Sequence, residues 1–483
     1  MQTHMTKLIP RLVTALTLSA FTAQADPQID SWFTTYSGKY ARLYATDADK
    51  TSGNAVSTWS RGSISQSIPA YCGIYFVGYS SSWIYIRSTG LASHIMGPWY
   101  LNSARTQLFP NEPKNTATLY RLPRSPSVPG SKTLTGLGAI GYFVDGVAMF
   151  DTRDAFYWNG SADVGGTGYW NRDAWINEGL TFDPGQAHQP GDGTHHYHAN
   201  PIALRYLVGD HVDFISATKT YSESTGSVTK HSPILAWVRD GFPLYGPYGY
   251  SSASNSLSGI RRMLSGYALR NGQKGTQNLT SVGRTNIPPW AVRLYNVSAS
   301  QSGPTVSTSY PLGRYMEDND YLGDLGYTKG LDFDLDEYNG RYCYTPEFPN
   351  GTYAYFVSIN SDGTPAFPYN IGRAFYGNPT GNSVSSIGET VVTNFVGGSS
   401  SPLKLAKPAV ASGSGNITLT WSSVEGGTYM VSGTSNFHAW AANVTPSVTA
   451  TGILATATDT GGAKTNSCRF YKVTRTALAT AAN

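Results

Sequence analysis

The sequence predicts a mainly β protein: a large antiparallel β domain with few short helices, followed by a small β-sandwich. The first observation is composition, because the 483 residues include 33 tyrosines and 52 glycines and only 13% are charged. Tyrosine favours strands and glycine favours turns, so this composition suits a turn-rich β protein. The second observation is pattern. Short runs of Val, Ile, Tyr and Phe alternate with Gly, Pro, Ser and Asn along the chain, as strands joined by turns do.

Residues 1–25 have the pattern of a secretory signal peptide. Lys7 and Arg11 are positive, an apolar run follows, and Ala23-Gln24-Ala25 resembles a small-residue cleavage site. The apolar run is too short to cross a membrane, and no longer one follows. We therefore expect a soluble, secreted protein, located outside the cell or in the periplasm.

The large domain is expected over residues 26–396. Its clearest predicted strands are 83–87, 140–150 and 352–359, and its predicted helical turns are 174–178 and 259–264. In the second of these strands, Asp145-Gly146 suits the tight turn of a hairpin.

A boundary is expected at residues 397–402, which form a flexible polar linker by composition. In residues 403–483, short strand-like runs have the spacing of a β-sandwich. This part resembles the small immunoglobulin- or fibronectin-like modules that end many bacterial exported proteins. It contains no catalytic constellation, so we expect the chemistry to lie in residues 26–396.

Charge and cysteine content narrow the function further. The net charge of +4 is spread without a basic block, which argues against a nucleic-acid surface. Three cysteines are too few for a disulfide scaffold. An exported protein can form one bridge, and Cys72–Cys343 is the pair we expect. Cys468 is predicted to be a small buried residue.

The strongest chemical signal is a histidine-rich turn. His188, His195, His196 and His198 are four of the nine histidines and fall within eleven residues. In an extended segment, His196 and His198 share one face, and His195 and Tyr197 share the other. Neutral imidazole is the commonest protein ligand of transition metals, so this pattern predicts a metal site. The alternative is a hydrogen-bonded polar strand without an ion.

Three ordered segments carry a family resemblance, and they are residues 188–201, 231–250 and 331–349. They contain His-His-Tyr-His, Asp-Gly-Phe-Pro-Leu-Tyr-Gly-Pro and Leu-Asp-Glu-Tyr-Asn-Gly. Together they resemble the YHYH family of bacterial exported proteins, named for a Tyr-His-Tyr-His motif. His195 stands in place of the first Tyr. Cys343 stands where a second such run of the family has a histidine.

The resemblance implies a site to which both runs contribute, with His196, His198 and Cys343. Imidazole and thiolate together favour copper or zinc. Zinc usually takes four ligands, or three and a water, and the candidates to complete the site are His188, His231 and Cys343. Three interpretations of Cys343 stay open: it is a thiolate ligand, a disulfide partner or a plain buried thiol.

Other polar residues are candidates for supporting roles. Asp240 is a candidate to orient an imidazole through its free ring nitrogen. Tyr197 is a candidate pocket residue, although tyrosine is also simply a favoured strand residue. The acidic runs at 317–324 and 332–337 suggest calcium as a further cofactor, with solvated turns as the favoured alternative.

Two functions follow from these features. The first is a mononuclear copper or zinc site around His196 and His198, serving oxidation or hydrolysis of an extracellular substrate. The second is a non-catalytic surface or matrix protein that binds polysaccharide or protein through an aromatic-rich face. The number of metal ligands that converge on one point distinguishes these two functions.

Overall fold

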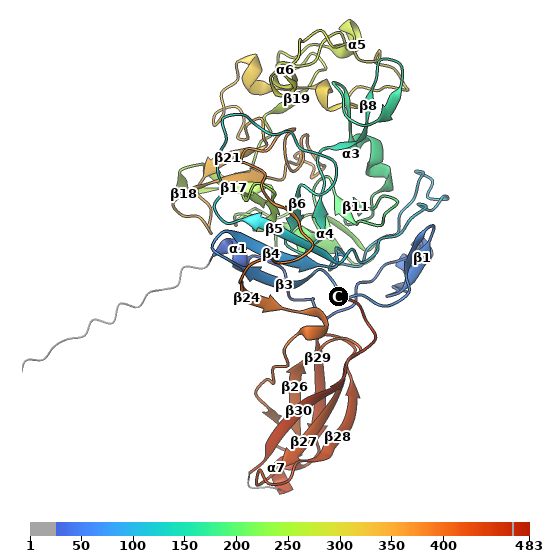
Figure 1. Cartoon of the computed structure of the whole chain (residues 1–483), viewed down its shortest axis with the longest axis vertical. Helices are drawn as coiled ribbons and strands as arrows, with labels where there is room; N and C mark the ends of the chain where they lie inside the picture. Colours follow the sequence, from blue (N-terminus) through green and yellow to red (C-terminus); the bar gives the residue numbers. More distant parts are fainter. Residues whose placement is uncertain (1–25, 466–467) are drawn as a thin grey trace, which may run out of the picture.

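The computed structural model describes residues 26–465 and 468–483, so the predicted signal peptide lies outside the described residues. The chain is mainly β, with many antiparallel sheets and few short helices, as predicted (Figure 1). No helix of the described segments combines the length and apolarity needed to cross a bilayer.

The centre of the molecule is an eight-stranded mixed sheet. Its order is β11 (Ala187–His188), β12 (His196–Tyr197), β7 (Ala148–Met149), β6 (Gly141–Phe143), β15 (Ile234–Val238), β16 (Pro243–Tyr245), β22 (Thr352–Phe356) and β21 (Gly340–Cys343). All neighbours are antiparallel except β12 with β7 and β16 with β22. The histidine-rich turn therefore forms one edge of this sheet, and Cys343 lies at the other.

A five-stranded antiparallel sheet shares the same core. Its order is β23 (Asn382–Ser383), β5 (Thr118–Pro123), β4 (Trp83–Ser88), β3 (Ile74–Tyr79) and β24 (Val392–Val396). Ile84 and Ile86 from β4 belong to one buried apolar cluster with Phe143 from β6 and Trp237 from β15. Burial of these side chains from both sheets holds the central sheet in place.

A second apolar cluster lies farther from the five-stranded sheet, around Trp170 and Trp290. The elements in this region are β8 (Arg153–Trp158), β9 (Asp163–Gly165), β10 (Asn171–Asp173), α3 (Ala174–Glu178), η1 (Gly179–Thr181), β19 (Tyr267–Leu269), α5 (Leu279–Val282), α6 (Pro289–Tyr295), η2 (Met316–Asp318), β20 (Asn319–Tyr321) and η3 (Leu322–Leu325). The helix predicted at 174–178 is confirmed as α3. The side chain of Asp173 caps it by accepting from the Ile176 N–H.

Short elements complete the large domain. They are α1 (Pro27–Asp30), α2 (Asp47–Ser52), β1 (Trp59–Arg61), β2 (Ile64–Gln66), α4 (Ile202–Leu207), β13 (Val212–Ile215), β14 (Thr220–Glu223), β17 (Tyr248–Ser252) and β18 (Asn255–Arg262). The helical turn predicted at 259–264 is wrong, because most of this stretch belongs to β18, which pairs with β17.

The C-terminal residues form a separate lobe with its own core (Figure 1). Its two three-stranded antiparallel sheets are β25 (Ala409–Val410), β26 (Ile417–Ser422) and β29 (Leu454–Asp459), and β28 (Ala441–Thr449), β27 (Thr428–Thr434) and β30 (Phe470–Ala477). A short helix, α7 (Gly462–Thr465), follows β29. The division into domains and the immunoglobulin-like resemblance stay predictions.

The connection between the lobes is more ordered than its composition predicts. Gly397 and Gly398 are buried, and η4 (Gly398–Ser400) begins there. The Gly398 N–H donates to Ser37, and the Ser399 N–H donates to the side chain of Asn483. The C-terminus thus returns to the junction of the two lobes, as Figure 1 also shows.

The cysteines differ from two expectations. Cys72, Cys343 and Cys468 are all free thiols, so the expected Cys72–Cys343 disulfide is not formed. Cys72 and Cys343 are buried, but Cys468 is exposed rather than buried. Burial raises the pKa of both buried thiols, which disfavours the thiolate form of Cys343.

Candidate metal centre

The hairpin of β11 and β12 brings three histidines onto one face. The two strands are antiparallel, with His188 directly opposite His196. A turn closes the loop between them, where the Gly193 N–H donates to the Pro190 carbonyl over 3.0 Å and Gly193 has φ +81°. His198 follows two residues after His196 and therefore points to the same face. The predicted pairing of His196 with His198 agrees with this geometry.

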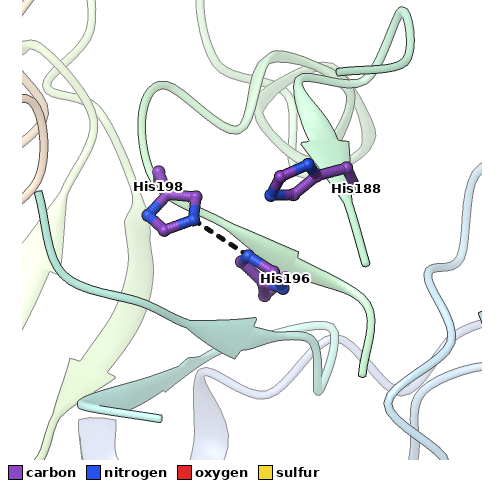
Figure 2. Close-up of side chains that lie close together, drawn as sticks. All are labelled: His188, His196 and His198. Atoms are coloured by element: carbon purple, nitrogen blue, oxygen red, sulfur yellow. Dashed lines mark hydrogen bonds between the residues drawn. The ribbon is translucent and has the colours of Figure 1, made fainter. Parts of the chain in front are cut away.

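The three imidazoles converge on one point (Figure 2). The Nε2 atoms of His196 and His198 are 2.9 Å apart. His188, His196 and His198 each offer a ligand nitrogen, and these nitrogens all lie within 4.8 Å of one another. Two nitrogens that are each about 2.0–2.1 Å from one ion lie roughly 3 Å apart, so this spacing fits a shared metal ligand set.

The hydrogen bonds of the three Nδ1 atoms fix the protonation of the rings. His196 Nδ1 lies 2.9 Å from the Thr194 carbonyl, and His198 Nδ1 lies 2.7 Å from the Asp151 carbonyl. A carbonyl oxygen only accepts, so each Nδ1 carries the proton. In a neutral ring, Nε2 then holds a lone pair that is free to bind a cation.

His188 follows the same rule through Thr181. Its Nδ1 lies 2.8 Å from Thr181 Oγ1, whose own proton is donated to the Glu178 carbonyl over 2.7 Å. The hydroxyl oxygen must therefore accept from His188 Nδ1–H. All three histidines consequently present an Nε2 lone pair to the same point.

Burial keeps these rings neutral. His188, His196 and His198 are 5%, 2% and 4% exposed. Burial lowers the pKa of all three imidazoles, and the neighbouring histidines lower those of His188 and His196 further. Phe150 stacks on His196 with ring centroids 3.8 Å apart, and Phe182 packs edge-on against His188. The site is therefore a neutral, apolar-walled group of ligands.

The side chain of Glu178 lies beside two of the three imidazoles. Glu178 Oε2 lies 3.4 Å from His198 Nε2 and 3.6 Å from His188 Nε2. Glu178 ends α3, and its side chain is 28% exposed. Burial, with Asp154 and Asp173 nearby, raises the pKa of Glu178 to about 8. The convergent ligand set therefore consists of the three imidazoles, and Glu178 lies beside two of them.

Without a cation this arrangement is unfavourable. Two Nε2 lone pairs that face each other at 2.9 Å repel, and each ring already uses its proton at Nδ1. A second proton would relieve the repulsion only by placing a charge in a buried site, which the lowered pKa values oppose. A bound metal ion removes the conflict.

The family assignment agrees with the residues that build this site. The family model described as YHYH protein matches residues 119–368, about half of the chain. The chain belongs to the YHYH family. Neither curated proteins nor solved structures gave a match. The matched range includes the β11–β12 hairpin, Glu178 and the two later segments that carry the resemblance, residues 231–250 and 331–349.

Two other predicted ligands lie elsewhere. Cys343 is on β21, at the sheet edge opposite to the hairpin, so it cannot join the three histidines. His231 packs against the rings of Tyr245 and Tyr250, and its Nδ1 lies 2.7 Å from the Ser232 carbonyl. The two family runs therefore do not meet at one site in this YHYH protein.

The predicted supporting residues also differ. Asp240 accepts hydrogen bonds from the Tyr355 hydroxyl and from the Phe242 and Gly377 N–H groups, and among the described residues none of its partners is an imidazole. The contacts of Asp240 therefore do not support its predicted role in orienting a ligand. Tyr197 points away from the three histidines, as strand alternation requires, and packs against Phe143 at 5.0 Å. The ligands are instead oriented by two carbonyls and a threonine.

Most carboxylates of the two acidic runs are paired with arginines, although Asp332 stays in an exposed turn. Asp318 forms a two-point ion pair with Arg284, and Asp334 forms one with Arg261. Among the described residues, the groups close enough to hold a metal do not include these carboxylates. Calcium therefore gains no support from this geometry.

Glu178 was missed as a site residue, although the helix that ends with it was predicted. Sequence reasoning treated residues 174–178 only as a helical turn, ten residues before His188. The tertiary fold brings Glu178 beside His188 and His198, and no local sequence pattern indicated this contact.

Proposed function

We propose that this YHYH protein is an exported metal-binding protein in which His188, His196 and His198 bind one copper or zinc ion. The observation that supports it best is the fixed protonation of the rings, since all three Nδ1 atoms donate to protein oxygens. Three Nε2 lone pairs then converge in a buried site. The apparent signal peptide in residues 1–25 supports export.

Glu178 governs what such a site does. With Glu178 as fourth ligand, the coordination shell is closed, as in structural or electron-transfer sites. With Glu178 outside the coordination shell, a position would stay open toward solvent, and Glu178, whose pKa is raised to about 8, would hold a proton beside it near neutral pH. A bound ion supplies Lewis-acid chemistry as zinc and one-electron chemistry as copper. The partial exposure of Glu178 favours the open form, and therefore a hydrolase or an oxidoreductase.

Metal analysis of the purified mature chain tests this function. We expect about one equivalent of copper or zinc at the site in wild type, and its loss in a His196→Ala, His198→Ala double variant. His438→Ala is the matched control, because His438 is exposed in the C-terminal lobe. Equal metal content in wild type and the double variant, or no copper or zinc bound by wild type after reconstitution, would contradict the proposal.

A second function is favoured by one observation. A surface pocket of about 620 Å³ is lined by aromatic side chains, namely Tyr157, Trp158, Tyr169, Trp170 and Tyr295. Aromatic faces beside polar groups are suited to sugar rings. Binding of the protein to insoluble polysaccharide that Trp158→Ala abolishes would support this role. Equal binding by both proteins would exclude the pocket.

A further inference from the structure

A second group of metal-ligand atoms lies on the other face of the histidine hairpin. His94, Asp183 and His195 each offer a ligand atom, and these atoms all lie within 4.8 Å of one another. His94 comes from the loop after β4, Asp183 follows η1, and His195 directly precedes β12. Because His195 and His196 are consecutive in an extended segment, they point to opposite faces.

The imidazoles of this second group have unused polar atoms. Within the part of the chain that the structure describes, neither ring nitrogen of His94 or of His195 has a hydrogen-bond partner. His94 is 6% exposed and His195 is 1% exposed. Buried polar groups are nearly always hydrogen-bonded, so four unpartnered nitrogens in one place need an explanation. The hydroxyl of Tyr197, whose ring lies 6.1 Å from that of His195, is also buried without a partner.

The carboxylate of the group is held in place by the backbone. Asp183 Oδ2 accepts from the Gly97 N–H over 2.7 Å, and Oδ1 accepts from the N–H groups of Gly185 and Ala187 over 2.8 and 3.2 Å. These bonds fix the position of the carboxylate before any ligand binds. They leave one lone pair of Oδ2 available, because each carboxylate oxygen accepts about two bonds and Oδ2 accepts only one here.

Gly185 provides the space for His94. A Cβ atom at Gly185 would lie 2.4 Å from His94 Nε2 and 3.1 Å from Asp183 Oδ1. Real Cβ atoms do not approach so closely, so only glycine at this position lets the imidazole and the carboxylate come together.

An ion pair alone does not explain the group. His94 Nε2 lies 3.8 Å from Asp183 Oδ2, which is longer than a hydrogen bond. A charged His94 would still leave His195 with two buried nitrogens and no partner. A cation between the three side chains satisfies one nitrogen of each ring and the carboxylate at once.

We propose that His94, Asp183 and His195 bind a second metal ion, a divalent transition metal of the zinc, iron(II) or manganese(II) class. Two imidazoles and a carboxylate, without sulfur, are the ligands that this class prefers. This site goes beyond the three-histidine site and does not depend on it. The two ions would lie on opposite faces of one strand, at His195 and at His196.

The test measures Zn²⁺ stoichiometry on the full mature chain after chelator treatment. Wild type should bind two equivalents, and His94→Gln should bind one. His94→Gln is chosen because it leaves the residues of the β11–β12 hairpin unchanged. His231→Gln is the matched control and should match wild type. Equal Zn²⁺ binding by wild type and a folded His94→Gln protein would overturn the second site.

If His94→Gln does not fold, the Zn²⁺ stoichiometry of the His196→Ala, His198→Ala double variant tests the second site instead. This double variant is expected to remove only the three-histidine site. One retained equivalent supports the second site, and none overturns it. The double variant also separates the two proposals, because failure of the three-histidine site would leave its stoichiometry equal to that of wild type.

Discussion

The three histidines can act as metal ligands because each one donates a hydrogen bond from Nδ1, which leaves the lone pair of its Nε2 free. Thr181 is the most informative of the three acceptors, because it is the only side chain among them. Its hydroxyl accepts from His188 Nδ1 and donates to the Glu178 carbonyl. One residue therefore orients both a ring and the end of the helix that carries the carboxylate.

Thr181→Val tests this role, since it keeps the shape of the side chain but removes the hydroxyl. We expect metal affinity to fall by roughly 10–100-fold, the usual effect of losing a hydrogen bond to a ligand. Competition with a chelator of known affinity measures it. Thr181→Ser keeps the hydroxyl and should stay near wild type. Equal affinity of the valine variant and wild type would show that Thr181 does not orient His188.

At the scale of elements, a buried carboxyl joins β10 to η2. Glu317 accepts from the N–H and the side-chain amide of Asn171 and from the Tyr295 hydroxyl. It is fully buried, and burial raises its pKa from 4.5 to about 7. The folded protein therefore holds this proton over a pH range in which the unfolded chain has released it.

This shift predicts a pH-dependent contribution to stability. Since the folded-state pKa is raised, the contribution is fully present below pH 4.5 and is lost as the pH rises through 7. The free energy of unfolding of wild type, relative to that of Glu317→Gln, should fall by about 3 kcal/mol between pH 4 and pH 8. Denaturant unfolding of both proteins at several pH values measures it. A pH-independent difference would contradict the raised pKa.

Local sequence patterns predict some parts of the candidate site, and others depend on the tertiary fold. Strand alternation was enough to pair His196 with His198, and the turn after His188 made it a candidate. Glu178 and the His94 group come from segments that only the tertiary fold brings together, so no local pattern located them. Cys343 was misplaced because motif order does not say which sheet edge a strand occupies. Residues 259–264 were misjudged because pairing with β17 outweighed local preference.

At the scale of the whole molecule, the C-terminal lobe has an apolar core separate from the two clusters of the large domain, so we expect the proposed metal sites not to need this lobe. All ligands belong to residues 94–198, whereas the C-terminal core is built around Leu419, Trp421 and Tyr429. The lobes are nevertheless joined at both ends of the C-terminal segment, because the Gly398 N–H donates to the Ser37 hydroxyl and the Asn115 side-chain amide donates to the Asn483 carbonyl.

Limited trypsin digestion tests this independence. Gly397 and Gly398 are buried, so we expect the first cut in the exposed stretch just after them, at Lys404, since Lys407 is followed by Pro408 and resists trypsin. The large fragment should keep the metal content of the intact chain, as measured after its purification. Loss of metal from a cut and separated large fragment would mean that the C-terminal lobe supports the sites.

The most direct test of the account is a crystal structure of the metal-loaded mature protein, with anomalous diffraction measured at the absorption edge of the bound metal. The account predicts an anomalous peak within coordination distance, about 2.0–2.1 Å, of Nε2 of His188, His196 and His198. A map without a peak there, with His196 and His198 in direct contact as a hydrogen-bonded pair, would contradict it.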